Sequence, residues 1–108
     1  MKKSQPLVSI VINCYNGEEF LKCAIDSIYS QTYTNWEIIF WDNCSTDRSA
    51  EIALSYDKRL RYFKSTTDVP IPIYEAKSLA VQKVSGEFIA FLDCDDWWES
   101  SKLEKQVP

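Results

Sequence analysis

The chain has 108 residues, of which 45% are hydrophobic, so it is long and apolar enough for one domain with a core. Its formal net charge of −4 and its dispersed basic residues argue against binding to nucleic acid or to an anionic membrane surface. The sequence contains no histidine, which removes the most common general base and transition-metal ligand.

Short apolar runs alternate with helix-forming patterns along the chain. Strands are predicted at residues 7–12, 37–41, 60–63 and 88–92, and helices at 18–30, after 45–47 and at 73–84. The strands lack a two-residue alternation, and the last one is apolar at every position, which is typical of parallel strands buried on both faces. We therefore expect a single α/β domain, residues 1–108, with a mostly parallel sheet of about four strands and helices on both of its faces.

Local signals mark the faces and ends of the predicted helices. One stripe of the first helix carries the apolar residues Phe20, Leu21, Ala24, Ile25 and Ile28. This stripe predicts the face that packs on the core. Gly86 is expected to end the third helix, since glycine is the natural C-terminal stop. Ser101 and Glu104 form a capping-box pattern, which predicts that a further helix begins there.

The four cysteines are widely spaced and include no CxxC pair: Cys14, Cys23, Cys44 and Cys94. The apolar run near the N-terminus is too short and too rich in β-branched residues for a secretion signal. We therefore expect reduced thiols that pack as small apolar side chains. The expected location is the cytoplasm, with a peripheral place at the inner face of the membrane left open.

Polar side chains follow three of the predicted strands. They are Asn13, Tyr15 and Asn16, then Asp42, Asn43 and Ser45, and then Asp93, Asp95 and Asp96. Because ligands bind outside the carboxyl ends of the strands in an open parallel sheet, these residues predict a binding crevice. Capping and turn roles remain alternative explanations for Asn16, Asn43 and Ser45 taken singly, and for Asp42.

Asp93-Cys94-Asp95 is the sharpest feature of the sequence. In extended backbone the two carboxylates point to the same side, with Cys94 turned away. Two adjacent carboxylates repel each other unless a positive charge lies between them. Mg²⁺ suits this pair because it takes one or two protein carboxylates and fills its other positions with water and phosphate. The residues thus favour a site for a nucleotide phosphate and a divalent cation.

Other residues extend this interpretation, each with an ordinary structural alternative. Tyr15 offers a ring for stacking on a base; alternatively, it packs as an ordinary aromatic residue of the loop. Asp42 offers an acceptor for a base N–H or a ribose hydroxyl. Lys77 lies near the proline-rich loop within reach of a pyrophosphate, or is simply solvated. Trp97 and Trp98 offer a wall for a sugar, although core packing is favoured for one of the two.

The order of these motifs resembles the inverting family 2 glycosyltransferases with the GT-A fold. The similarity runs from Val8 to Gln106 and is carried by Tyr15-Asn16, Ser30-Gln31-Thr32-Tyr33, Asp42, Ser45-Thr46-Asp47, Gly86-Glu87, and Asp93-Cys94-Asp95 with Asp96. The resemblance implies a Rossmann-like half of a GT-A enzyme of bacterial cell-surface polysaccharide biosynthesis. Its donor would be a nucleotide sugar, with a UDP-sugar expected.

By position, the resemblance implies a role for each candidate site residue. Asn13 and Tyr15 would lie against the base, and Asp42 would bind the uracil. Lys77 stands where the family often has an arginine near the donor. Asp93 would face the ribose or the donor sugar and contribute to the metal site, and Asp95 would bind Mg²⁺ or Mn²⁺ directly.

The resemblance also places the catalytic base beyond residue 108, so we expect the isolated chain to bind the donor without transferring its sugar. The acceptor would be a carbohydrate or a lipid-linked molecule, and a homodimer is left open. This chain departs from the family pattern at Asn13, where proline or threonine is usual, and at Asn43-Cys44, where Asp-Gly is common.

Two other functions are possible for a small α/β domain with clustered acids. A non-catalytic nucleotide-binding domain is the alternative, since the base is expected elsewhere. A receiver-type signalling module needs an acid pair after its first strand and a lysine after a late strand. Here the first strand ends in Asn13 and no fifth strand is predicted, which argues against that class.

Overall fold

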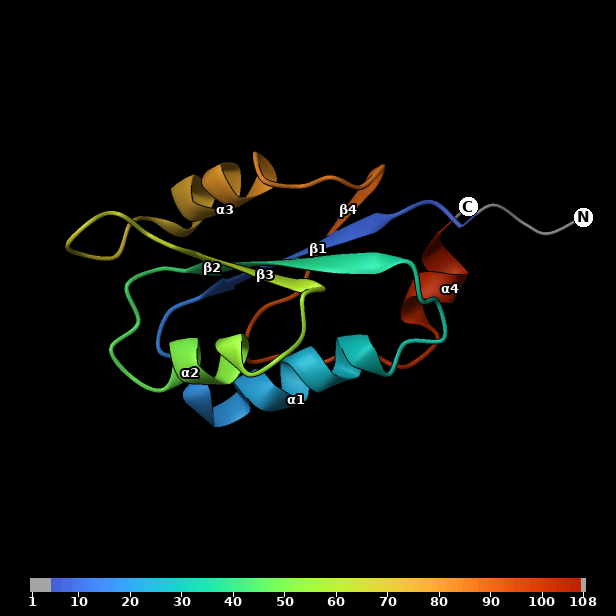
Figure 1. Ribbon diagram of the computed structural model, residues 1–108, viewed down its shortest axis with the longest axis horizontal. Helices are drawn as coiled ribbons and strands as arrows, with labels where there is room; N and C mark the ends of the chain where they lie inside the picture. Colours follow the sequence, from blue (N-terminus) through green and yellow to red (C-terminus); the bar gives the residue numbers. More distant parts are fainter. Residues whose placement is uncertain (1–4, 108) are drawn as a thin grey trace, which may run out of the picture.

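The computed structural model describes residues 5–107 and contains a parallel four-stranded sheet in the order β3-β2-β1-β4 (Figure 1). The strands are β1 (Val8–Cys14), β2 (Trp36–Asp42), β3 (Leu60–Lys64) and β4 (Phe88–Phe91). The helices are α1 (Glu18–Tyr29), α2 (Ser49–Leu54), α3 (Ile73–Val81) and α4 (Lys102–Gln106). The predicted α/β class and parallel sheet are confirmed.

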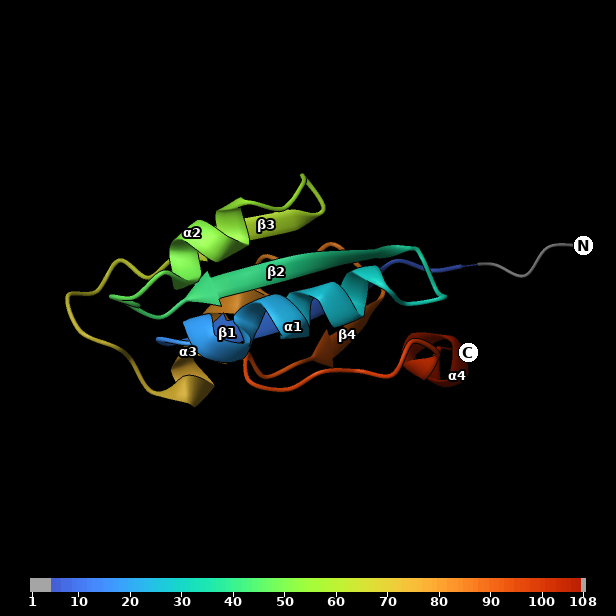
Figure 2. The same cartoon turned by 90° about the horizontal axis from the view of Figure 1, so that it is seen from below.

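Helices cover both faces of the sheet, as expected. α1 and α2 lie on one face and α3 lies on the other (Figures 1 and 2). β1 serves both cores, because Ile10 and Ile12 pack toward α1 while Val11 packs with Ala76 and Ala80 of α3. This double burial explains why the strand shows no polar alternation. None of the helices described is long and apolar enough to cross a membrane.

β4 contradicts the expectation that it is buried on both faces. Its side chains Phe88, Ile89 and Phe91 are 39%, 42% and 46% exposed. β4 is an edge strand of the described sheet, and α3 packs over β1 and β2 rather than over β4. The apolar run therefore predicted the strand correctly but not its position in the sheet.

Two predicted details of α1 and α3 are corrected by the structure. Leu21, Ala24, Ile25 and Ile28 are fully buried, but Phe20 is 52% exposed at the N-terminal end of α1. α3 ends at Val81, before the predicted residue 84. Gly86 does not end it by adopting a left-handed conformation, since neither glycine has a positive φ. Gly86 is required instead for close approach to the start of β1.

The predicted capping box of α4 does not form, because the Ser101 side chain makes no capping hydrogen bond. The Glu104 carboxylate accepts a hydrogen bond from Thr32 Oγ1 at 2.9 Å. Gln31 takes over the capping role: its Oε1 accepts from the Leu103 N–H at 3.1 Å, and its Nε2 donates to the Glu99 carbonyl at 2.6 Å. Residues after α1 thus anchor α4 through tertiary contacts.

Replacing Gly86 by alanine should destabilise the fold. An added Cβ would lie 2.6 Å from the Leu7 carbonyl oxygen and 2.9 Å from the Ser9 nitrogen, both of them backbone atoms in or next to β1. We expect Gly86→Ala to lower the free energy of unfolding by about 1–3 kcal/mol in urea denaturation. The neighbouring, exposed Ser85→Ala is the control and should change it by less than about 0.5 kcal/mol. Equal stabilities for the two variants would contradict the close approach.

Candidate functional site

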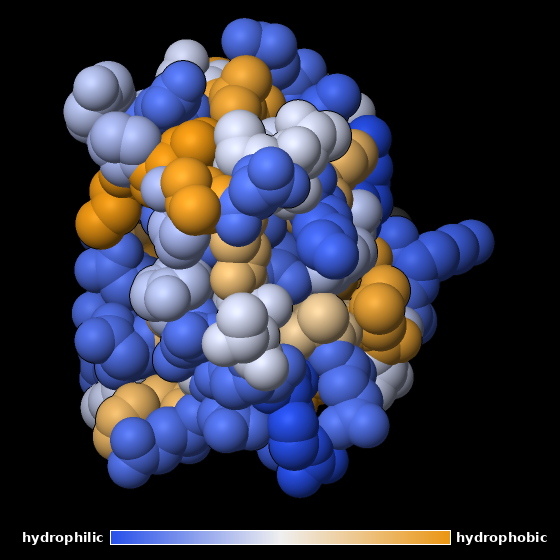
Figure 3. All heavy atoms as spheres, turned by 90° about the vertical axis from the view of Figure 1, so that its left-hand side faces the viewer, coloured by the Kyte–Doolittle hydropathy of each residue, from blue (hydrophilic) through white to orange (hydrophobic). Residues whose placement is uncertain are grey.

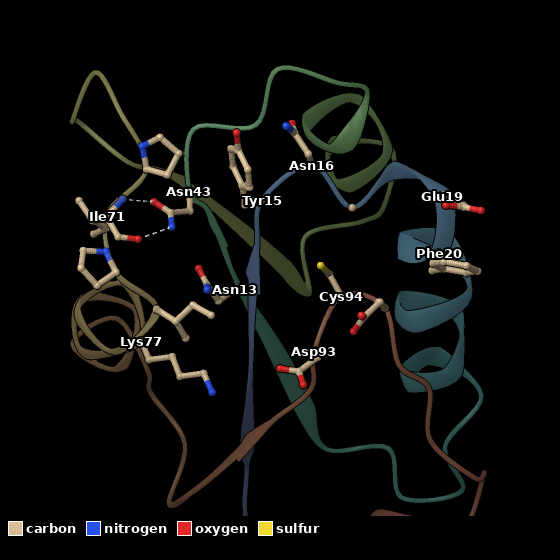
Figure 4. Close-up of a pocket in the computed structure, with 15 residues that line it drawn as sticks. Asn13, Tyr15, Asn16, Glu19, Phe20, Asn43, Ile71, Lys77, Asp93 and Cys94 are labelled. Carbon is tan, nitrogen blue, oxygen red and sulfur yellow. Dashed lines mark hydrogen bonds between the residues drawn. The ribbon is translucent and has the colours of Figure 1, made fainter.

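A cavity of about 750 Å³ opens at the edge of the sheet where β1 and β4 end. Figure 3 looks onto this side of the molecule, and Figure 4 shows the cavity itself. Its wall comes from the end of β1, the β1–α1 loop, the start of α1, the residue after β2, the loop before α3, α3 and the turn after β4. The lining includes five of the six predicted site residues: Asn13, Tyr15, Lys77, Asp93 and Asp95.

The two acids reach the cavity by a different backbone path than predicted. Cys94 and Asp95 lie in a turn, and the Asp96 N–H donates to the Asp93 carbonyl at 3.1 Å. The expected extended conformation is therefore wrong, although both Asp93 and Asp95 line the cavity. Asp96 does not line it; its Oδ1 accepts from the N–H of Trp97 at 2.8 Å.

The end of β1 contributes one aromatic ring and one unpaired polar atom. Tyr15 is 51% exposed, so its ring is available to a ligand. Asn13 Oδ1 is buried and has no hydrogen-bond partner among residues 5–107. Leaving such an acceptor unpaired costs about 1–3 kcal/mol. An arriving hydrogen-bond donor would recover that cost, which makes Asn13 a natural ligand contact.

The loops after β1 and β2 are tied to each other. Asn16 has φ 50°, and its Oδ1 accepts from the Thr46 N–H at 2.7 Å, while its own N–H donates to Ser45 Oγ at 2.9 Å. Asp47 Oδ2 accepts from the Glu18 N–H at 3.1 Å, within the first turn of α1. The turn and capping alternatives therefore describe Asn16 and Ser45 well, and these contacts hold the rim in place.

Asp42 is the one predicted site residue that does not line the cavity. It is 1% exposed, and both of its carboxylate oxygens are engaged. Oδ1 accepts from the Ser45 N–H at 2.9 Å and Oδ2 accepts from the Tyr62 hydroxyl. Burial and the Asp42 carboxylate raise the pKa of Tyr62, so the hydroxyl stays a donor. Because Asp42 is buried and does not line the cavity, contact with a base would require the surrounding side chains to move.

Asn43 holds the proline-rich loop against the sheet, a role the sequence did not indicate. Its Nδ2 donates to the Ile71 carbonyl at 2.8 Å, and its Oδ1 accepts from the Ile71 N–H at 3.0 Å (Figure 4). An amide matches both groups, whereas an ionised carboxylate could match only one. The sequence did carry one signal of this role, because Asn43 stands where the family commonly has an aspartate.

Cys44 adopts φ 66°, which lies in the left-handed region that favours glycine. The family commonly has glycine here, so the loop keeps the backbone shape that the family pattern suggests. The Cys44 thiol lies 3.2 Å from the Thr67 carbonyl oxygen, which supports the conformation.

Lys77 brings a cation to the wall opposite the acids. Its ammonium lies 5.2 Å from the centre of the Phe91 ring and faces Asp93 across the cavity (Figure 4).

One of the two tryptophans packs in the core, as expected: Trp98 is 8% exposed, whereas Trp97 is 60% exposed. Neither of them lines this cavity.

Two thiols meet beneath the cavity. Cys14 is fully buried, whereas Cys94 lines the cavity and is half-buried. The neighbouring Cys94 thiol lowers the pKa of Cys14 to about 7, and the same neighbour contact together with burial raises the pKa of Cys94. All four cysteines are free, and Cys23 is exposed, so the expectation that each cysteine packs as a small apolar side chain is wrong for Cys23.

The donor set fits a hard divalent cation that is shared with a ligand. Within residues 5–107, no group of three or more His, Cys, Asp or Glu side chains is arranged to hold a metal ion. Asp93 and Asp95 provide two carboxylates at an open cavity. This matches Mg²⁺, which uses one or two protein carboxylates and completes its shell with water and phosphate oxygens.

An open parallel sheet with a polar crevice at its carboxyl edge is the arrangement in which α/β proteins bind their ligands. The family model described as glycosyl transferase family 2 matches residues 9–108. The chain therefore belongs to glycosyl transferase family 2.

The relatives agree with this assignment. The chain is 38% identical over 102 residues to the Escherichia coli UDP-Glc:alpha-D-GlcNAc-diphosphoundecaprenol beta-1,3-glucosyltransferase WfgD, covering 94% of the chain and 40% of WfgD. It is 39% identical over 108 residues to an uncharacterized glycosyltransferase of Haemophilus influenzae, covering 96% and 42%. The chain thus spans well under half the length of these curated relatives.

A solved structure shares the fold. TarS of S. aureus, residues 1–349 in complex with UDP-GlcNAc, superposes with a TM-score of 0.79 at 26% identity. The match covers 91% of this chain and 29% of that one. The GT-A-like architecture that the resemblance implied is confirmed.

The two hydrogen bonds between the Asn43 side chain and the Ile71 backbone give a pH-dependent prediction. Asn43→Asp removes the donor to the Ile71 carbonyl and buries a charge, so we expect a loss of about 1–3 kcal/mol in unfolding free energy at pH 7. Burial raises the folded-state pKa of the introduced carboxyl. The protonated carboxyl again donates a hydrogen bond to the Ile71 carbonyl. The loss of unfolding free energy relative to wild type should therefore be smallest below the ordinary pKa of Asp, and it should grow as the pH rises through the raised pKa of the variant carboxyl.

Urea denaturation of wild type and variant across this pH range measures the effect. Asn16→Asp is the matched control, since Asn16 uses its Oδ1 only as an acceptor and a carboxylate preserves that role. A deficit that is independent of pH would contradict the donor role of Asn43.

Proposed function

We propose that the chain binds a nucleotide-sugar donor, expected to be a UDP-sugar, within a glycosyltransferase that transfers the sugar to an acceptor hydroxyl. The observation that carries this proposal is the composition of one cavity. Its lining combines an exposed aromatic ring, an unpaired buried amide oxygen, two carboxylates and a lysine. These are the groups that a base, a sugar and a metal-bound diphosphate require.

The base would lie at the end formed by β1. The Tyr15 ring offers a stacking face, and Asn13 Oδ1 would accept from a base N–H such as the imide of uracil. WfgD carries UDP-Glc in its name and TarS was solved with UDP-GlcNAc, which supports a uridine nucleotide for this chain. Asp42 as a base contact stays a prediction.

The diphosphate would lie between the acids and Lys77. Asp95, together with Asp93, would hold Mg²⁺ or Mn²⁺, and Lys77 would face the phosphate oxygens from the opposite wall. When bound, the cation would offset the negative charge of the departing nucleotide diphosphate. Lys77 would add a fixed positive charge to the same task.

The reaction we propose is a single displacement with inversion at the sugar's anomeric carbon. The acceptor hydroxyl attacks as a general base takes its proton, and the nucleotide diphosphate leaves. We place that base in the remainder of a longer protein, because the matched relatives are more than twice as long as this chain. The name of WfgD includes a lipid diphosphate acceptor, which supports a lipid-linked acceptor here.

The stacking role of Tyr15 predicts a selective loss of affinity. Tyr15→Ala should weaken UDP binding by about 1–3 kcal/mol, or roughly 5- to 150-fold in Kd, because the base loses its aromatic partner. Tyr15→Phe is the control and should bind UDP as the wild type does, since it keeps the ring. Isothermal titration calorimetry measures both. Equal weakening by the two substitutions would assign the effect to the hydroxyl and not to stacking.

The metal role predicts that UDP affinity depends on Mn²⁺ through Asp95. Calorimetric titration with UDP should give tighter binding with Mn²⁺ than in its absence, and Asp95→Asn should remove most of that difference. Asp96→Asn is the matched control, because Asp96 does not line the cavity, and it should keep the metal dependence. Failure of UDP to bind, or equal binding with and without Mn²⁺, would overturn the metal-assisted donor site.

A further inference from the structure

We propose that Cys14 and Cys94 are an oxidation site, at which a reversible disulfide forms directly beneath the cavity and lowers its affinity for ligand. The pair joins the end of β1 to the turn that carries Asp93 and Asp95. The effect on ligand binding rests on the function proposed above, whereas formation of the disulfide does not.

Parallel pairing brings the two cysteines near each other. β1 and β4 pair from Val8 opposite Phe88 to Val11 opposite Phe91. The Leu92 N–H donates to the Val11 carbonyl at 3.0 Å, so the chain after β4 continues beside β1. Cys14 is the last residue of β1, and Cys94 lies in the turn two residues after Leu92.

Both thiols also point to the same face of the sheet. Cys14 belongs to the core cluster beneath α1, and Cys94 packs against that cluster. A Cβ built on Gly17 would lie 2.8 Å from the Cys94 sulfur and 3.0 Å from the Cys14 sulfur. Both sulfurs thus lie within contact distance of one point, which places the two thiols next to each other.

The two cysteines differ in access, which assigns their roles. Cys94 lines the open cavity, so a small oxidant reaches it, whereas Cys14 is fully buried. A peroxide would oxidise the Cys94 thiol to a sulfenic acid: an S–O bond forms, the O–O bond breaks and water leaves. Cys14 sulfur then attacks the Cys94 sulfur, the S–S bond forms and the sulfenic oxygen leaves as a second water.

The bond would alter the site because Cys94 stands between the two acids. An S–S bond is about 2.05 Å long, shorter than any contact between two thiols. Closing that distance draws the turn of Asp93 and Asp95 toward the end of β1. The reduced form leaves the turn free to adopt the geometry that a cation and a diphosphate require.

The first test is chemical and needs no ligand. The Cys23→Ser/Cys44→Ser double variant leaves only Cys14 and Cys94 as thiols. After treatment with hydrogen peroxide, intact mass should fall by two hydrogen atoms, and peptide mapping should find the Cys14–Cys94 link, which dithiothreitol reverses. Adding Cys94→Ser, or separately Cys14→Ser, should abolish the mass loss. Stable sulfinic or sulfonic acids on Cys94 with no intramolecular link would overturn the proposal.

The second test measures the consequence. Titration with UDP and Mn²⁺ should show a Kd at least about fivefold higher for the oxidised double variant than for its reduced form. Dithiothreitol should restore the lower value. An unchanged Kd in a fully disulfide-bonded sample would overturn the effect on binding. Absence of UDP binding in the reduced protein would count against the proposed function instead, while the mass measurement would still decide the oxidation site.

Discussion

The parallel pairing of β1 with both β2 and β4 is the constraint on which the site depends. On one side it aligns Cys14 with Asp42, and on the other side it pairs Val11 with Phe91, two residues before Asn13 and Asp93 respectively. Because parallel strands end at one edge, segments distant in sequence deliver their polar residues to one crevice. A slip of one residue would turn these side chains to the opposite face and dismantle the site.

The polar residues at this edge separate into those that build it and those that remain available. Hydrogen bonds to neighbouring loops engage the side chains of Asn16, Asp42 and Asn43, and Asp42 also accepts from Tyr62 of β3. Asn13 and Tyr15 keep an acceptor and a ring for a ligand. The first group makes the rim rigid, so that the second group is held in position before a ligand arrives. This division is what favours a binding site over a set of ordinary turns.

Sequence patterns predicted the strands and helices better than they predicted the burial and hydrogen-bond partners of those elements. The buried strands β1 and β2 and most of the α1 stripe were predicted correctly, because apolar periodicity reports packing directly. The burial of β4 was not, since the apolar run does not say whether a strand lies at an edge or in the centre. The capping box at Ser101 failed for a related reason: the distant residue Gln31 supplied the hydrogen bond instead.

The sequence by itself determined the alternation of strands and helices, and the gathering of acids and amides after three of the strands. Both follow from local order along the chain, which the amino-acid types record. Only the tertiary structure decided that Asp42 is buried, that Asn43 binds both backbone groups of Ile71, and that Cys14 lies next to Cys94. Each of these outcomes depends on the register and spacing between distant segments, and no single segment encodes them.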